Sequence, residues 1–177
     1  MIAIARWGLL IWGALSLVGV IFIAATFFPQ LGPGDRIDSA SKRDVRFVLN
    51  WCGLGDERIE KVIRSHVGAR SSNGDHLDAY AIQISYVELA ELTKPTKDLR
   101  SQWHRGDALP QVLDDALGFV IGWRYRIPWF PSEAELRSSA FYVYPWSVHL
   151  RGLDPSAAEL IFVRPADRMV FYFEGQM

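Results

Sequence analysis

Residues 158–174 read AELIFVRPADRMVFYFE, two apolar runs joined by a short polar connection that begins at Pro165. β-Branched and aromatic residues fill both runs, and turn-forming residues separate them, which is typical of a β-hairpin. Another run rich in aromatic and β-branched residues precedes the pair. The end of the chain therefore predicts three consecutive strands, over residues 141–150, 159–164 and 169–174.

Upstream of this hairpin the pattern predicts a mixture of strands and helices. Apolar residues alternate along 45–51 and 77–85, which predicts two half-buried strands. They recur at helical spacing along 59–67 and 109–120, which predicts two helices. Serines at capping-box spacing from a glutamate predict two further short helices; these serines are Ser85 and Ser132.

Strands and helices that are mixed in this way favour an α+β domain. We expect it to span residues 45–177, an ordinary length for one domain, with helices covering one face of a largely antiparallel sheet. Residues 29–44 are polar and interrupted by proline and glycine, which predicts a flexible tether.

The N-terminal stretch that begins at Trp7 and ends at Phe28 carries no charge. As a helix it would be roughly 33 Å long, enough to cross a hydrocarbon core of about 30 Å. The run is longer than that of a cleaved signal peptide. The sequence therefore predicts that residues 1–28 form an uncleaved transmembrane anchor, with the lipid bilayer as one partner.

Two arguments about the membrane orientation of this stretch conflict. Arg6 precedes it, whereas Arg36, Lys42 and Arg43 follow it, and that count places the domain in the cytoplasm. Long domains, however, translocate largely regardless of charge. We expect a single-pass membrane protein whose domain lies on the exported side, periplasmic or extracellular.

Composition excludes some functions. Nineteen basic and twenty acidic residues give a net charge of −1, so the chain shows no electrostatic sign of a nucleic-acid partner. A single cysteine, Cys52, excludes an internal disulfide and is typical of a small buried residue. The sequence carries no known catalytic, nucleotide-binding or metalloprotease motif, so no catalytic residue and no cofactor is assigned.

Two histidines and two aspartates are the nearest approach to a metal or acid–base site. They are His66, Asp75, His76 and Asp78, which can bind zinc if the loop between them folds back. Their spacing matches no established metal signature. The alternative is a polar loop around the turn at Asn73-Gly74.

An aromatic and basic segment is the candidate partner-binding surface. Its residues are Arg124, Tyr125, Arg126, Trp129 and Phe130, of types that are enriched at binding hot spots. The alternative is that these rings close one end of the core with the arginines stacked over them. Pro145, in the predicted strand 141–150, suits a sheet edge that can accept another strand.

We therefore expect a membrane-anchored interaction or accessory protein whose domain binds a partner protein at the envelope, such as an immunity-type inhibitor or a complex subunit. The alternative is a membrane-tethered hydrolase or metal-dependent enzyme that uses the histidine and aspartate group. A third possibility, a sensor domain, would need an output module from a partner, because few residues precede the predicted anchor.

Overall fold

The computed structural model describes residues 16–18, 34–71, 73–94 and 102–177. The chain divides into two compact units, Met1–Gly34 and Asp35–Met177. In the first unit, the described residues 16–18 are helical and exposed. The second unit holds every strand of the described chain, and it begins inside the stretch expected to be a tether.

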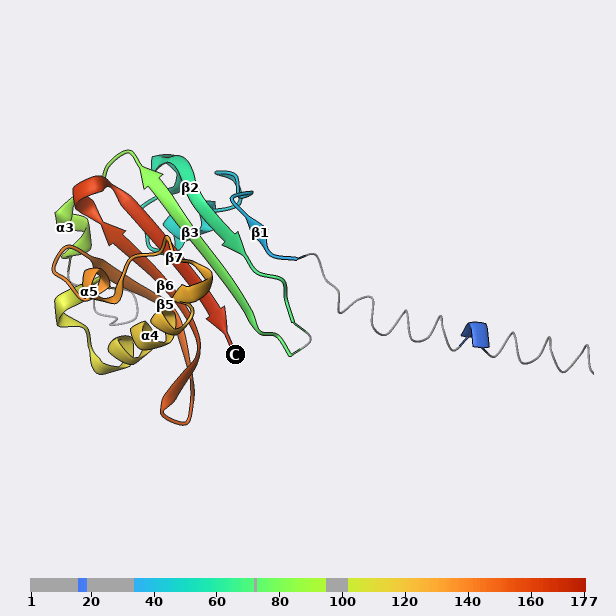
Figure 1. Ribbon diagram of the computed structural model, residues 1–177. Helices are drawn as coiled ribbons and strands as arrows, with labels where there is room; N and C mark the ends of the chain where they lie inside the picture. The colour runs from blue at the N-terminus through green and yellow to red at the C-terminus, as the bar shows by residue number, and fades with distance from the viewer. Residues whose placement is uncertain (1–15, 19–33, 72, 95–101) are drawn as a thin grey trace, which may run out of the picture. The chain divides into compact units, whose positions relative to one another are not determined.

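A single antiparallel sheet organises the second unit (Figure 1). In the described residues it has seven strands in the order β1-β2-β3-β7-β6-β5-β4. Their bounds are β1 (Arg36–Ile37), β2 (Ile59–Val67), β3 (His76–Ile84), β4 (His104–Arg105), β5 (Tyr142–Arg151), β6 (Asp154–Arg164) and β7 (Met169–Gln176).

The predicted C-terminal hairpin is confirmed as β6 and β7, joined by a 3₁₀ turn over Pro165–Asp167. Arg168 closes the connection with a positive φ of 58°. Because side chains alternate along a strand, the register places Phe162 opposite Phe171 on one face and Ile161 opposite Tyr172 on the other. The sheet is therefore apolar on both faces at its centre.

Short helices cover both faces. One face carries α4 (Gln111–Gly122) and α5 (Glu133–Leu136), and the other carries α2 (Arg46–Trp51) and α3 (Leu89–Leu92). Figure 1 shows α4 and α5 in front of the sheet. Each face has its own core, in which burying a large apolar side chain contributes about 1.5–3 kcal/mol. We call these the α4 face and the α2 face.

Two predicted elements are exchanged in the structure. Residues 46–51, expected as a strand, form helix α2, and residues 59–67, expected as a helix, form strand β2. In α2 the buried positions are Val48 and Leu49, which are adjacent and therefore fit a helical stripe better than alternation. In β2 two register shifts interrupt the ladder, so its alternation is not visible in the sequence.

These differences correct the expected fold class. The α+β description is wrong, because the described chain is dominated by an antiparallel sheet and its helices are few and short. The physical reason is that β-branched residues in β2 complete the sheet instead of covering it. The strand predicted over 77–85 and the helix predicted to end near Val120 are confirmed as β3 and α4.

The expected transmembrane helix is also corrected. In the residues that the structure describes, no helix is long and apolar enough to cross a membrane. Within the predicted span, residues 16–18 are described, and they are helical. The rest of the predicted anchor lies outside the described residues. The expectation of a single-pass membrane protein with an exported domain is therefore not supported by the described structure.

Candidate functional site

The outer edge of β5 is the first feature of the candidate site. β4 pairs only with the start of β5, where His104 lies opposite Val143 and Arg105 opposite Tyr142. Among the described residues, no strand pairs with the outer side of residues 145–151. An edge of this kind presents a row of backbone N–H and C=O groups to an incoming chain.

An apolar groove of about 630 Å³ lies along this edge and the start of α4. Of the described residues that line it, none is Asp, Glu, Lys or Arg. Three apolar side chains at this groove are almost half exposed: Val112 (45%), Trp146 (44%) and Leu150 (49%). The complete lining is His104, Pro110, Val112, Leu113, Pro145, Trp146, Ser147, Val148, His149 and Leu150.

Local sequence explains the shape of this edge. Pro145 lacks a backbone N–H, and a register shift between Pro145 and Ser147 places Trp146 in a bulge. A bulge re-aims its side chains, and the ring of Trp146 stacks on that of Trp51 from α2, with centroids 4.6 Å apart and planes within 5°. Trp146 is therefore held in place although almost half of it is exposed.

The β5–β6 hairpin continues beyond the groove. Gly152 turns the chain with a φ of 69°, and the next residue, Leu153, is 91% exposed. In Figure 1 this hairpin extends past the end of α4. The tip therefore presents a large apolar side chain that packs against nothing in its own core.

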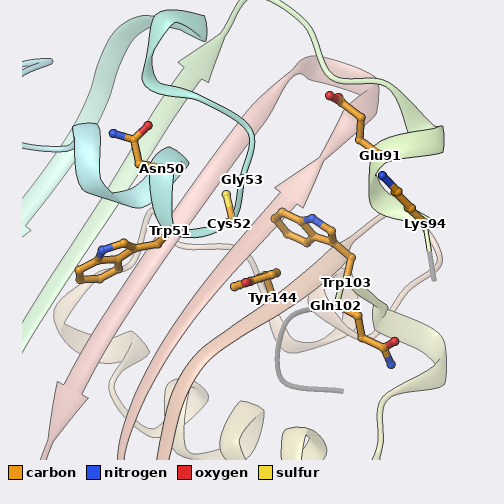
Figure 2. Close-up of a pocket in the computed structure, with 9 residues that line it drawn as sticks. All are labelled: Asn50, Trp51, Cys52, Gly53, Glu91, Lys94, Gln102, Trp103 and Tyr144. Atoms are coloured by element: carbon orange, nitrogen blue, oxygen red, sulfur yellow. The ribbon is translucent and has the colours of Figure 1, made fainter. Parts of the chain in front are cut away.

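A smaller pocket of about 270 Å³ lies between the end of α2, α3 and the ring of Trp103 (Figure 2). The rings of Trp103 and Tyr144 are 5.2 Å apart. The carboxylate at this pocket belongs to Glu91, which accepts hydrogen bonds from both terminal nitrogens of Arg58 at 2.7 Å. This contact lowers the pKa of Glu91. The charge of Glu91 is therefore already neutralised.

The thiol in this pocket, Cys52, is also unreactive in its folded setting. Burial raises its pKa to about 12, and the thiol donates a weak hydrogen bond to the carbonyl of Leu49 at 3.4 Å. A thiol attacks as the thiolate, so Cys52 is not suited to nucleophilic chemistry. Figure 2 shows three aromatic residues at this pocket, Trp51, Trp103 and Tyr144, together with the polar Asn50, Glu91, Lys94 and Gln102.

The predicted partner-binding segment is divided between core and surface. Phe130 is 2% exposed and lies in the core of the α4 face, while Trp129 packs partly against that core. Arg124 donates from Nε to the carbonyl of Phe130 at 3.2 Å. By contrast, Tyr125 is 79% exposed. Partner binding by this segment stays a prediction, and its accessible part is centred on Tyr125.

Arg126 of the same segment forms an ion pair with Asp35, at 2.6 Å. The carboxylate of Asp35 also lies 3.4 Å from Nε2 of His66 on β2. The backbone N–H of Ala69 and then Arg126 lower the pKa of Asp35, whereas burial lowers the pKa of His66. Arg126 is thus engaged in holding Asp35 against the sheet.

The predicted metal group is not assembled. His66 lies opposite Ala79 in the ladder, so it points to the α4 face, while His76 and Asp78 alternate with Ala79 and point to the α2 face. Asp75 accepts a hydrogen bond from Asn73 in the connecting turn. In the described parts of the chain, no group of three or more His, Cys, Asp or Glu residues is placed to hold a metal ion.

His76 instead belongs to a polar group on the α2 face that the sequence did not reveal. Its Nε2 lies 2.8 Å from Glu174, and its Nδ1 lies 2.8 Å from the carbonyl of Gly74. Tyr172 donates to the other oxygen of Glu174 at 3.1 Å. Glu159 lies directly opposite Glu174, and burial together with that charge raises the pKa of Glu159.

This polar group joins strands that are distant in the sequence, which is why sequence spacing gave no sign of it. A carboxyl with a raised pKa beside a charged carboxylate is a known acid–base arrangement. However, neither hollow described above is lined by Glu159 or Glu174. The groove along β5 therefore remains the better candidate for a binding site.

Comparison with protein-family models, curated proteins and solved structures found no match to this chain.

Proposed function

We propose that this protein binds a partner polypeptide by adding an extended segment of it to the outer edge of β5. The observation that carries the proposal is the outer edge of residues 145–151, which pairs with no strand among the described residues and lies beside an apolar groove. In strand addition, main-chain hydrogen bonds provide affinity, and pockets for alternate side chains provide specificity. The β5 edge offers both.

The chemistry of the groove defines the segment that it would accept. Val112 and Leu150 are exposed apolar groups, and the described lining carries no charged Asp, Glu, Lys or Arg. Burying a charge there without a partner would be costly. The preferred segment is therefore extended, uncharged where it faces the groove, and rich in β-branched or aromatic residues, which favour strands.

Selection from a display library of random short peptides, with the full chain as bait, tests this proposal. The chain should be kept in mild detergent because residues 7–28 are uncharged and apolar. We expect the selected peptides to alternate apolar and polar residues. Because a buried valine contributes about 1.5 kcal/mol, Val112→Asp should weaken their binding about tenfold or more.

Two features make Val112→Asp a clean variant. Val112 lies in the first turn of α4, where an acidic residue is favoured by the helix dipole, so the fold should be retained. The matched control is Ile63→Asp, since Ile63 is a partly exposed apolar residue on β2, near the other edge of the sheet. Equal binding by wild type and Val112→Asp would overturn the proposal.

The segment around Tyr125 is a separate proposal for a contact outside the groove. Its support is the 79% exposure of this tyrosine beside two arginines, the residue types common at binding hot spots. Tyr125→Ala should weaken capture of a selected partner protein and leave the melting temperature unchanged. Unchanged capture would remove this contact from the account.

A further inference from the structure

We infer that the pocket between α2, α3 and Trp103 is a second binding site, and that it takes a small aromatic molecule with one negative charge. The pocket shares none of its described lining residues with the groove along β5. At about 270 Å³, it lies just below the usual range for small-molecule sites, about 300–1,000 Å³. Its size therefore selects a ligand of one or two rings.

Two aromatic rings line this pocket side by side (Figure 2). Tyr144 projects from β5 and is 8% exposed, and Trp103 packs against the same core of the α2 face. The two ring centroids lie 5.2 Å apart, and the ring planes are inclined by 57°. Cys52 adds a buried, protonated thiol, which behaves as a small apolar group. These fixed groups offer an aromatic ligand surfaces for stacked and edge-on contacts.

The charge of the pocket comes from Lys94. Among the described lining residues, the charged ones are Glu91 and Lys94. Both oxygens of Glu91 accept hydrogen bonds from Arg58, and one of them also accepts from the backbone N–H of Glu88 at 3.1 Å. Lys94 has no ion-pair partner among the residues that the structure describes, and Figure 2 shows its side chain between Glu91 and the ring of Trp103. The lining therefore leaves one positive charge unbalanced, which an anionic group of the ligand would complement.

The polar atoms of the pocket argue against two other classes of ligand. The side-chain oxygen of Asn50 already accepts from the backbone N–H of Asp56 at 3.1 Å, and the oxygens of Glu91 are engaged as well. A saccharide would bring several hydroxyl groups into the pocket, and burying polar groups without partners is costly. A cationic ligand would be repelled by Lys94. An aromatic ring with a single carboxylate needs only the apolar wall and one ammonium group.

Titration of the full chain in mild detergent with 2-naphthoate tests the site. The indole N–H signals of the seven tryptophans can be followed by NMR, and Trp103→Phe assigns the signal of Trp103. We expect this signal to shift in a saturable way, with a Kd of about 1 mM or tighter for a ligand of this size. The signal of Trp129, which packs against the core of the α4 face, should not move.

Two related probes separate the contributions of ring and charge. 2-Naphthamide has the same rings without the charge, and cyclohexanecarboxylate has the charge without an aromatic ring. Each should bind about fivefold more weakly than 2-naphthoate, because each lacks either the contact with Lys94 or the contact with the aromatic rings.

Lys94→Gln removes the charge at an exposed position, so the fold should be retained. It should weaken the binding of 2-naphthoate about fivefold and leave the binding of 2-naphthamide unchanged. The matched control is Lys61→Gln, since Lys61 is an exposed lysine on β2 that does not line the pocket. Val112→Asp, in the groove, should also leave the binding of 2-naphthoate unchanged, which keeps this test independent of the proposed function.

Three outcomes would overturn the inference. The first is a Trp103 signal that does not shift, or that shifts no more than the signal of Trp129. The second is equal affinity for 2-naphthoate and cyclohexanecarboxylate, which would exclude recognition of the aromatic ring. The third is equal binding of 2-naphthoate by wild type and Lys94→Gln, which would exclude recognition of the negative charge.

Discussion

Phe130→Ala is expected to lower the free energy of unfolding by about 3–5 kcal/mol, the usual cost of truncating a buried phenylalanine to alanine. The ring is 2% exposed. Its centroid lies 5.7 Å from those of Phe162 and Phe171 and 6.3 Å from that of Phe173. Such aromatic pairs contribute about 0.5–1.5 kcal/mol each beyond the area that they bury.

This loss is large beside the total stability of a domain, about 5–15 kcal/mol. For a unit of this size, the melting temperature should fall by roughly 6–20 °C. Thermal and urea unfolding of the full chain, followed by tryptophan fluorescence, would measure it. The effect should be independent of any binding partner, because Phe130 closes the core instead of forming the binding surface.

Tyr125→Ala is the matched control from the same segment. At 79% exposure, its loss should change stability by no more than about 0.5 kcal/mol. A Phe130→Ala variant that loses less than about 1 kcal/mol would refute the reasoning. It would mean that the ring is not packed as described, and that the segment is free to act as a recognition surface.

Two further predictions concern charge and close packing. The pKa of Glu159 is raised above its ordinary value of 4.5 by burial and by Glu174. The stability that the Glu159 carboxyl contributes is therefore present below pH 4.5 and is lost as the pH rises through the pKa of the folded state. Glu159→Gln should therefore raise the melting temperature near neutral pH, by the equivalent of about 0.2–1 kcal/mol, and should lose that advantage in acid; a larger gain in acid would contradict this sign. Gly106→Ala should lower the free energy of unfolding by about 1–3 kcal/mol, because a Cβ would lie 2.1 Å from the carbonyl oxygen of Leu136. At Gly118 a Cβ would have no atom within 4 Å, so Gly118→Ala should raise the melting temperature. Equal shifts of the melting temperature in the two variants would contradict this packing argument.

Local signals in the sequence were sufficient for the C-terminal hairpin. Its two apolar runs and the Pro165 connection lie next to each other in the chain, so turn chemistry and alternation both act over a few residues. They were not sufficient for β2, where register shifts hide the alternation, nor for α2, where a short apolar run fits either period. The nine residues of β2 were expected to cover the sheet as a helix, whereas they extend it as a strand, and the sheet was therefore under-predicted.

The candidate site was predictable only in part. Pro145 signals a strand edge or a bulge from sequence alone, and it does lie at the edge where the bulge occurs. The groove was not predictable, because it depends on where α4 packs beside β5. Sequence proximity was also misleading for His66 and His76, which lie near each other in the chain but point to opposite faces of the sheet.

The most direct test of the central claim is amide hydrogen exchange along β5 in the full chain. It should be measured in dilute solution, with and without a saturating selected peptide. If the edge accepts a strand, the amides of residues 146–151 that face outward should slow about tenfold or more in the sample with peptide, while the exposed edge of β2 does not change. Equal exchange of residues 146–151 in both samples would contradict the account.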